Sequence, residues 1–343
     1  MCREGWSAGG TAVGSPILTV AGFIAGLAIT LLASELLTRG LTRLGTKTGF
    51  SEGLLGLLGA LAADSPELST AVFAIVAGAG NVGVGVVLGS NLFNLAALLG
   101  LPAIVAGGVR IRRGPLILDA AVGLFVTAAA AVTVAGLLPP AAVALIVVPV
   151  TAAYVLVLAI PRRHLRRFRA LIPGVPQNLA EIAYEETHDR PAATHGSWTP
   201  VLLLPVALLG VIGGAFVMVH EALAAQAWLH LSAAVLGMLV LAALTSLPNL
   251  WVALHFARTD RGTALFSSAM NSNTINLLGG LIVPALFIGI GAAQGSLAYF
   301  TWLIELTLLA VLAPLPHSRL SRVAGSFIVG IYVIFVGLRV AGI

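Results

Sequence analysis

Long apolar runs separated by short polar or Gly/Pro-rich breaks occupy the chain from about Ile17 to Ile343. A helix of about 20 residues is needed to cross a bilayer core of roughly 30 Å, and the runs are of that length. The breaks lie at 38–49, 78–81, 107–115, 136–140, 161–198, 220–230, 257–262, 291–296 and 314–322. Nine breaks separate ten predicted spans, so the pattern predicts an all-α polytopic membrane protein with ten transmembrane helices.

Basic residues are confined to alternate breaks. Of the 18 lysines and arginines, 16 lie in the odd-numbered breaks, and Arg3 and Arg339 fall near the two ends of the sequence. Because basic residues accumulate in cytoplasmic loops, we expect a multi-pass protein of the cell membrane with both termini extracytoplasmic and loop 161–198 cytoplasmic. The first apolar run, from Pro16, is longer than the core of a cleaved signal peptide, so we interpret it as the first span.

Composition supports a membrane protein and removes several alternatives. The 343 residues are 59% hydrophobic and 9% charged, whereas soluble domains carry about 25% charged residues. A single cysteine, Cys2, excludes an internal disulfide framework and a multi-cysteine metal site. The net charge of +5 is accounted for by the loops, so the expected partners are the lipid bilayer and inorganic cations, with no nucleic acid.

The sequence is duplicated at a fixed interval. Shifted by 182 positions, LAADSPELSTAV (61–72) lies over ALTSLPNLWVAL (243–254), and GSNLFNL (89–95) lies over NSNTINL (271–277). Each half holds five predicted spans, an odd number, so the second half enters the membrane from the opposite side. This predicts two inverted five-helix repeats, 16–160 and 199–343, joined by linker 161–198. In secondary transporters of this architecture the substrate site lies between the repeats near the membrane midplane.

The duplicated stretches contain two acids in a membrane-embedded position. Asp64 and Glu67 are three residues apart on one helix face, and no span contains a deeply placed lysine or arginine to pair with them. Intramembrane acids mark ion or proton paths, and a carboxylate pair without a basic partner needs a cation or a shared proton. Pro66 and Pro248 each remove a helical donor, so we expect the freed carbonyl of Ala62 and its counterpart to face a cation.

Neutral oxygen donors accompany these acids. They are Ser90 and Asn94 in span three, Ser272 and Asn276 in span eight, and Thr245, Ser246 and Asn249 in span seven. Carboxylate, amide and hydroxyl oxygens are hard ligands, which suit sodium, calcium, magnesium or manganese better than softer metals. No resident cofactor is expected, because the bound ions would be the transported ones.

These motifs resemble the two alpha repeats of the calcium:cation antiporter superfamily, whose sodium/calcium exchangers carry G-T-S-x-P-E followed by G-S-N-x-F-N in each half. Here A-D-S-P-E and GSNLFN stand in the first half, and T-S-L-P-N and NSNTIN stand in the second. The resemblance implies a transporter rather than an enzyme. Specifically, it implies a secondary antiporter that exchanges Ca²⁺ against Na⁺ or H⁺ by alternating access.

The resemblance also assigns roles to individual residues. Glu67 and Asn249 match the paired cation-binding glutamates, Asn94 and Asn276 the mid-site amides or acids, Ser90, Ser246 and Ser272 the sodium-ligand hydroxyls, and Ala63 and Thr245 positions usually held by threonine. Two departures stand out. Asn249 replaces the second glutamate, and Asp64 replaces a serine or threonine, so both acids lie in the first repeat.

Other interpretations stay open at this point. The moved acid also fits exchange of another cation against H⁺ or Na⁺, or a transport-deficient relative acting as a sensor. Asp64 with Asp119 of span four would suit an intramembrane aspartyl protease, although Asp119 lies near the start of its span and no glycine-flanked aspartate motif is present. His188 and His195 of the linker are interpreted as solvated rather than as metal ligands.

The alternation of basic residues makes the topology testable. In a Cys2→Ala background, single cysteines introduced at 162–169 should react with a membrane-impermeant thiol reagent only when the cytoplasmic face is accessible. Reaction of these positions from the outer face of intact cells would contradict the predicted orientation.

Overall fold

The computed structural model describes residues 15–48, 60–159, 197–229, 232–289 and 297–342. Linker 161–198, apart from its last two residues, lies outside this part of the chain, and so do His188, His195 and the predicted break at 291–296.

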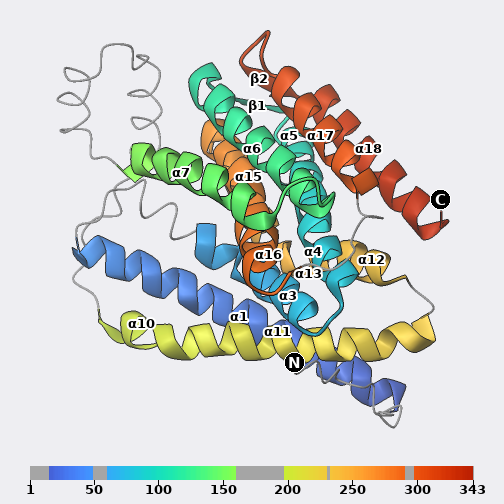
Figure 1. The fold of residues 1–343 in the computed structure, drawn as a ribbon. Coiled ribbons are helices and arrows are strands. Elements are labelled where there is room, and N and C mark those ends of the chain that lie inside the picture. The colour runs from blue at the N-terminus through green and yellow to red at the C-terminus, as the bar shows by residue number, and fades with distance from the viewer. Residues whose placement is uncertain (1–14, 49–59, 160–196, 230–231, 290–296, 343) are drawn as a thin grey trace.

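Helices make up nearly all of the described chain (Figure 1). In the first half they are α1 (Pro16–Thr48), α3 (Ser65–Val76), α4 (Gly80–Phe93), the π-helix η1 (Asn94–Gly100), α5 (Leu101–Val105), α6 (Arg113–Val134) and α7 (Pro140–Ala159). In the second half they are α10 (Thr199–Leu202), α11 (Leu204–Leu229), α12 (Ala233–Val235), η2 (Leu236–Leu241), α13 (Ala242–Thr245), α14 (Leu247–Arg258), α15 (Gly262–Leu277), η3 (Leu278–Ile282), α16 (Val283–Phe287), α17 (Leu297–Leu312) and α18 (Arg322–Val340). The short strands β1 (Gly108–Arg110) and β2 (Arg319–Ser321) pair antiparallel.

The helices account for the predicted spans in order. Within the described ranges, five are long and apolar enough to cross a bilayer singly, at Pro16–Gly45, Gly80–Val105, Arg113–Val134, Leu204–Gln226 and Arg322–Val340. Ala233–Thr245 and Leu247–Arg258 pass the same test as a pair bent by 50°, and Ser65–Val76, Pro140–Leu156 and Leu297–Leu312 are shorter apolar helices. With the more polar α15–α16 these make ten, and the all-α polytopic fold is confirmed.

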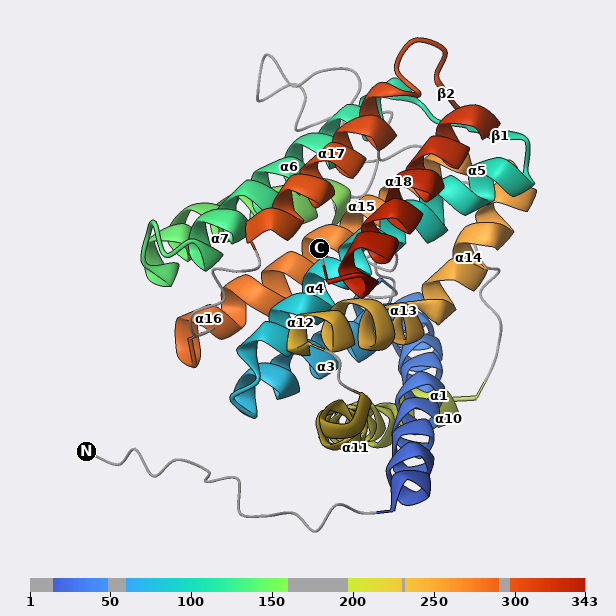
Figure 2. The same ribbon diagram turned by 90° about the vertical axis from the view of Figure 1, so that its right-hand side faces the viewer.

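Two of the predicted breaks, 38–49 and 220–230, are wrong as helix ends. The helix α1 runs on to Thr48, and α11 runs on to Leu229. Polar side chains end the apolar stretch without ending the helix, because neither segment contains the proline that would stop it. The two long helices pack along each other on one side of the molecule (Figures 1 and 2).

The spacing of the duplication recurs in the helix bounds. The helices α3 and α14 both start and end 182 residues apart, and so do α5 and α16. The backbone conformation repeats as well, since Gly78 has φ 78° and Asp260, at the matching position, has φ 56°. Aspartate is one of the few non-glycine residues that enters this left-handed region readily.

A reciprocal contact joins the two repeats. Asn91 Nδ2 donates to the carbonyl oxygen of Asn273 at 3.1 Å, and Asn273 Nδ2 donates to the carbonyl oxygen of Asn91 at 3.2 Å. A contact in which residue i meets j and j meets i is typical of a two-fold axis. The axis that relates the repeats therefore passes between these two asparagines.

Odd-numbered breaks contact one another. The third and ninth are joined by β1 and β2, with Gly108 opposite Ser321. The first and fifth meet where Lys47 Nζ lies 3.9 Å from the centroid of the Trp198 ring. Basic residues concentrate in these breaks, so the contacts bring arginine- and lysine-bearing breaks together in pairs, and the side of the membrane on which they lie stays a prediction.

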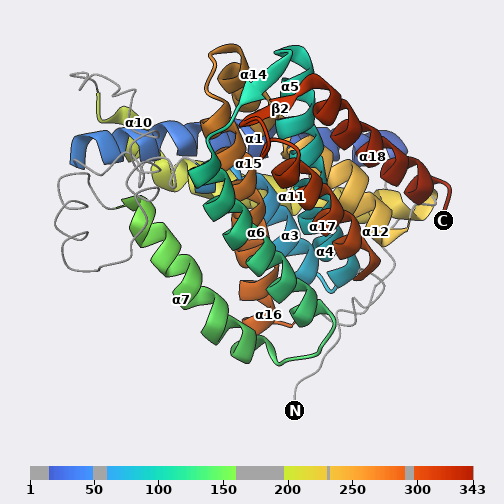
Figure 3. The ribbon, with the colours of Figure 1, turned by 90° about the horizontal axis from the view of Figure 1, so that it is seen from above.

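The α4–η1–α5 span lies at the centre of the fold (Figure 3) and is almost wholly buried, whereas most of α18 is exposed. Glycines bring the backbone of α4 close to η2. A Cβ added at Gly237 would lie 2.3 Å from the Val82 carbonyl oxygen, and one added at Gly89 would lie 2.3 Å from the Met238 carbonyl oxygen. The two helices touch backbone to backbone, which places the neighbouring polar residues of α4 next to the second repeat.

This close packing predicts that Gly89→Ala destabilises the protein by about 1–3 kcal/mol, the usual cost of overpacking a tight core. Gly330→Ala is the control, because a Cβ there meets no atom within 4 Å, and it should be neutral or slightly stabilising. Thermal unfolding of both variants in one detergent measures the difference. Equal unfolding temperatures would contradict the close approach.

Candidate functional site

The candidate site lies where two helices are interrupted. Asp64 precedes α3 and Ser246 precedes α14, and each helix has proline as its second residue. Proline is tolerated in the first turn of a helix but breaks its interior. Pro66 and Pro248 therefore end one helical segment and begin the next at equivalent depths in the two repeats.

The backbone carbonyl released by Pro66 is already occupied. The oxygen of Ala62 accepts hydrogen bonds from Ser65 Oγ at 2.6 Å and from Ser34 Oγ at 2.8 Å. The expectation that this carbonyl faces a cation is therefore wrong. Two hydroxyls, one local and one from α1, supply the donor that proline removed.

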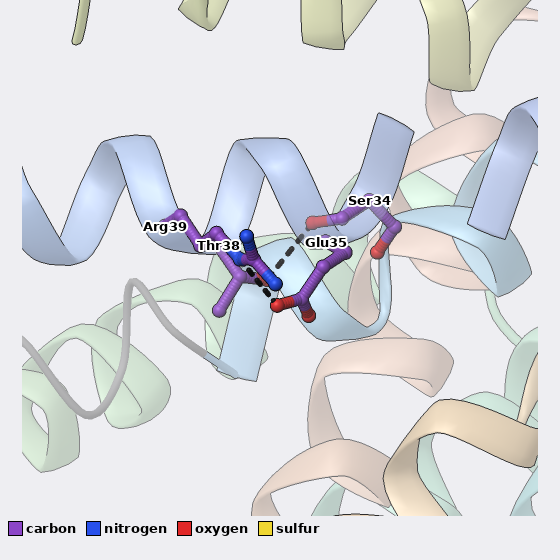
Figure 4. A network of polar contacts seen from close by, with 4 residues as sticks. All are labelled: Ser34, Glu35, Thr38 and Arg39. Atoms are coloured by element: carbon purple, nitrogen blue, oxygen red, sulfur yellow. Dashed lines mark hydrogen bonds and ion pairs between the residues drawn. The ribbon is translucent and has the colours of Figure 1, made fainter. Parts of the chain in front are cut away.

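The same turn of α1 carries Glu35, whose role the structure defines (Figure 4). Its Oε1 lies 2.7 Å from Arg39 Nε, and both side chains are more than half exposed. Thr38 Oγ1 donates to the carbonyl of Ser34 at 2.9 Å. Ser34 thus anchors α1 to the interrupted helix, and Glu35 belongs to a surface ion pair outside the site.

Asp64 and Glu67 are both 1% exposed, and each is held by the opposite repeat. Asp64 Oδ1 accepts from Asn249 Nδ2 at 2.9 Å, and Glu67 Oε1 accepts from Ser246 Oγ at 2.9 Å. A shift of 182 residues exchanges these two contacts, so they are related by the two-fold axis. The carboxylate that the resemblance leads one to expect at position 249 is therefore found at position 64, at the other end of the same contact.

Further polar side chains extend the hydrogen-bond network from Asp64. Asp64 Oδ1 also accepts from Ser272 Oγ at 2.7 Å, and Asn94 Nδ2 donates to Ser272 Oγ at 2.9 Å. Asn94 Nδ2 contacts Asn273 Oδ1 at 3.1 Å as well. Six of the ten predicted residues are thereby brought into one network: Asp64, Glu67, Asn94, Ser246, Asn249 and Ser272.

The other four predicted residues are less directly involved. Asn276 is buried one turn after Ser272. Ser90 donates to the carbonyl of Val86 in α4, and Thr245 donates to the carbonyl of Leu241 at the end of η2. Ala63 is half-buried and offers no polar side chain. Hydroxyls bonded to their own helix retain lone pairs that can accept or coordinate.

Several buried oxygens of the site have no hydrogen-bond partner within the described chain. They are Asp64 Oδ2, Glu67 Oε2, Asn94 Oδ1, Asn276 Oδ1, Thr70 Oγ1 and Asn91 Oδ1. An unpaired buried polar atom costs about 1–3 kcal/mol, and more when it is charged. A cation would satisfy the unpaired oxygens of Asp64, Glu67 and Asn94, which belong to one hydrogen-bond network.

The oxygen ligands available at the site suit some metal ions better than others. No group of three or more His, Cys, Asp or Glu side chains that could hold a metal occurs among the described residues. Two carboxylates supplemented by amide and hydroxyl oxygens match the hard-ligand chemistry of calcium and sodium. They do not match a thiolate or imidazole site for softer metals.

Sequence reasoning did not select Thr70 or Asn273 as site residues. Asn273 is visible in the sequence as the duplicate of Asn91, but its contact with Asn94 arises only from the packing of η1 on α15. Thr70 lies one turn after Pro66 and has no polar counterpart, since position 252 is valine. The π-helix η1 starts at Asn94, and η3 follows Asn276 closely. Such widened turns are frequent at functional sites.

Asp119 is separate from these residues. Its oxygens contact Tyr154 and Ser267, whereas those of Asp64 contact Asn249 and Ser272. The two aspartates thus belong to different networks. This arrangement is unsuited to a protease, which needs its paired aspartates to share one substrate.

Comparison with known proteins agrees with the geometry. The family model described as sodium/calcium exchanger protein matches residues 18–173 and 199–341. An uncharacterized membrane protein of Methanocaldococcus jannaschii is 26% identical over 326 residues, covering 93% of this chain and 97% of that protein.

Solved structures show the same fold. The sodium-calcium exchanger NCX_Mj, soaked with Na⁺ and Sr²⁺, superposes with a TM-score of 0.60 at 24% identity, covering 94% of this chain and 98% of that one. The H⁺/Ca²⁺ exchanger CAX superposes with a TM-score of 0.70 at 16% identity, covering 92% and 81%.

Because the carboxylate lies at position 64 instead of 249, we predict that a double variant with these two residues exchanged regains Ca²⁺ binding. Asp64→Asn removes one of the two buried carboxylates and should abolish the rise in unfolding temperature on adding Ca²⁺, because binding to the native state is what raises it. Asp64→Asn combined with Asn249→Asp returns the acid to the other end of the contact and should restore part of that rise. Asn249→Asp alone serves as the third corner of the cycle.

The response of the double variant to Ca²⁺ shows whether an acid at position 64 substitutes for one at position 249. If the double variant responds to Ca²⁺ no better than Asp64→Asn alone, the acid at position 64 does not substitute for one at position 249.

Proposed function

The chain belongs to the sodium/calcium exchanger protein family, and we propose that it is a secondary antiporter exchanging Ca²⁺ against Na⁺ or H⁺. Members of such a family move ions and are not enzymes. One observation carries the proposal. Asp64 and Glu67 are buried against the opposite repeat, each with one carboxylate oxygen that has no hydrogen-bond partner in the described chain.

Charge balance explains why two kinds of ion would compete for this site. The acids' hydrogen-bond partners are hydroxyls and an amide, so two ionised carboxylates leave two negative charges for a bound ion to neutralise. One divalent cation or two monovalent ones would supply that charge. Occupancy by Ca²⁺ and occupancy by Na⁺ or H⁺ are then mutually exclusive, which is what antiport requires.

The inverted repeats support alternating access. A two-fold axis through the Asn91–Asn273 contact makes the routes to the two membrane faces equivalent in overall fold, as in other transporters built from inverted repeats. A small apolar cluster formed by Ala33, Leu37, Ala62, Ala207 and Val211 joins the α1–α11 pair to the interrupted helix of the first repeat.

The protein lies in a membrane, and we place it in the cell membrane with both termini outside. The supporting feature is the grouping of the arginine-bearing breaks, which the positive-inside rule assigns to the cytoplasm. Large apolar side chains are exposed along the outer helices, including Leu145, Leu209 and Val323 at 65–77%. These would contact lipid acyl chains, and the expected soluble partners are the transported cations.

Flux measurements test the function directly. In proteoliposomes, imposed Na⁺ or H⁺ gradients should drive Ca²⁺ movement, and Glu67→Gln should reduce it to the level of empty liposomes, because the variant removes one of two charges that hold the ion. Glu35→Gln is the matched control, since the exposed Glu35 pairs with Arg39 on the surface, and its flux should equal wild type.

Other outcomes select other functions. Gradient-driven movement of a different cation would make the protein an antiporter of that ion, and Ca²⁺ binding without flux would favour a sensor. Wild-type levels of flux in Glu67→Gln would show that the ion binds elsewhere.

A further inference from the structure

A third acid is buried in the membrane-spanning part of the chain, outside the central network. Asp119 of α6 is 2% exposed. Its Oδ2 accepts from Ser267 Oγ at 2.5 Å, and its Oδ1 lies 2.8 Å from the Tyr154 hydroxyl. The same hydroxyl lies 2.6 Å from Asn271 Oδ1. The four residues form a chain from α6 through α7 to α15.

This chain contains more contacts than the hydroxyls have hydrogens. Ser267 and Tyr154 each carry one hydroxyl hydrogen. There are three oxygen-to-oxygen contacts, and each needs one hydrogen to be a hydrogen bond. With the Asn271 amide as oriented, the single Tyr154 hydrogen faces two acceptors, Asn271 Oδ1 and Asp119 Oδ1. A proton on Asp119 would turn both contacts into full hydrogen bonds, so the geometry favours a protonated Asp119.

The cluster is absent from the matching positions of the other repeat. A shift of 182 residues takes Ser267 to Gly85 and Asp119 to Thr301. Thr301 is exposed and donates to Ala298 of its own helix at 2.7 Å. The fold thus forms in one repeat without a buried acid at this position, so packing alone does not call for Asp119.

The cluster lies between one membrane face and the central site. Both α6 and α15 begin at arginine-bearing breaks. They run in the same direction, because Asp119 contacts Ser267 and, further along both helices, a Cβ at Gly123 would lie 3.8 Å from Thr274 Oγ1. At 1.5 Å per residue, Ser267 is about 7.5 Å into α15, and Ser272 of the central network is about 7.5 Å further along.

We propose that Asp119 is a proton-binding residue on the arginine-bearing side of the transport path, and that it adds a pH response that acts from that side. Intramembrane acids commonly serve as proton relays. The transport part of this inference rests on the proposed function, whereas proton binding by Asp119 does not. Because the acid exists in one repeat, it makes the two otherwise equivalent access routes chemically different.

Among the residues that the structure describes, few other titratable groups lie on the elements packed against α6. Of the elements packed against α6, α7 contributes Tyr154, and α15 and η3 contain no titratable side chain. The helix α17 contains Tyr299 and the exposed Glu305, and α6 itself begins with Arg113. A pH response lost on changing Asp119 can therefore be assigned to this carboxyl group.

The test measures Ca²⁺ flux in proteoliposomes of known protein orientation while the pH of each side is varied separately. Wild type should show a several-fold change of flux with pH on the arginine-bearing side. Asp119→Asn, which keeps the shape of the side chain, should lose that response but still transport, and Tyr154→Phe should shift its midpoint. Thr301→Val, at the matching position, is the control and should behave as wild type. An unchanged pH profile in Asp119→Asn would overturn the proposal.

Infrared difference spectra between acidic and alkaline buffer give a readout that does not depend on transport. Wild type should show a carboxylic-acid C=O band that Asp119→Asn lacks, while Thr301→Val retains it. If the band is absent at every pH, Asn271 instead donates through its nitrogen, and the proposal fails. If the wild-type protein shows the band but no gradient-driven Ca²⁺ flux, the antiporter proposal is overturned, whereas proton binding by Asp119 still holds.

Discussion

The burial of two carboxylates beside neutral partners is the constraint on which the rest of the structure depends. Asp64 and Glu67 are removed from water by the packing of two repeats, and desolvating a charge costs several kcal/mol unless something compensates it. Hydroxyl and amide donors satisfy one oxygen of each acid and leave the other without a partner. One oxygen of each acid is therefore left for a further ligand, which in the proposed function is the transported cation.

Two-fold symmetry explains how the second acid can change repeats without leaving the site. Asp64 Oδ1 and Asn249 Nδ2 are 2.9 Å apart, so an acid at either end of the 64–249 contact lies beside the same residues. Along the sequence, the absence of an acid at position 249 suggests that one charge of the site is lost. In three dimensions the second carboxylate still lies at this contact, but the first repeat supplies it, and the two acids are no longer related by the axis.

The sequence was sufficient for the features that repeat along it. The interval of 182 residues located both prolines, and the lack of basic partners marked Asp64 and Glu67 as ion-binding candidates. It could not show that Ser34 of α1 caps the Ala62 carbonyl, because that contact depends on tertiary packing. Hydropathy also placed breaks in α1 and α11, since polarity reports where a helix leaves the apolar core rather than where its backbone hydrogen bonds end. The partner of Asn249 was likewise invisible, because nothing along the chain specifies which residues meet across the axis.

Departures from the internal symmetry are as informative as the symmetry itself. Identical repeats in opposite orientation would give a transporter whose two faces respond alike to ions and protons. Positions 267 and 271 are polar, whereas the matching Gly85 and Gly89 allow α4 to pack closely. A single position cannot serve both purposes. Gly85 and Gly89 allow close packing but have no side chain, whereas the matching Ser267 donates a hydrogen bond to the buried Asp119. The duplicated fold thus places the candidate ion site between its two halves, and the sequence differences between the halves make the two routes to that site chemically different.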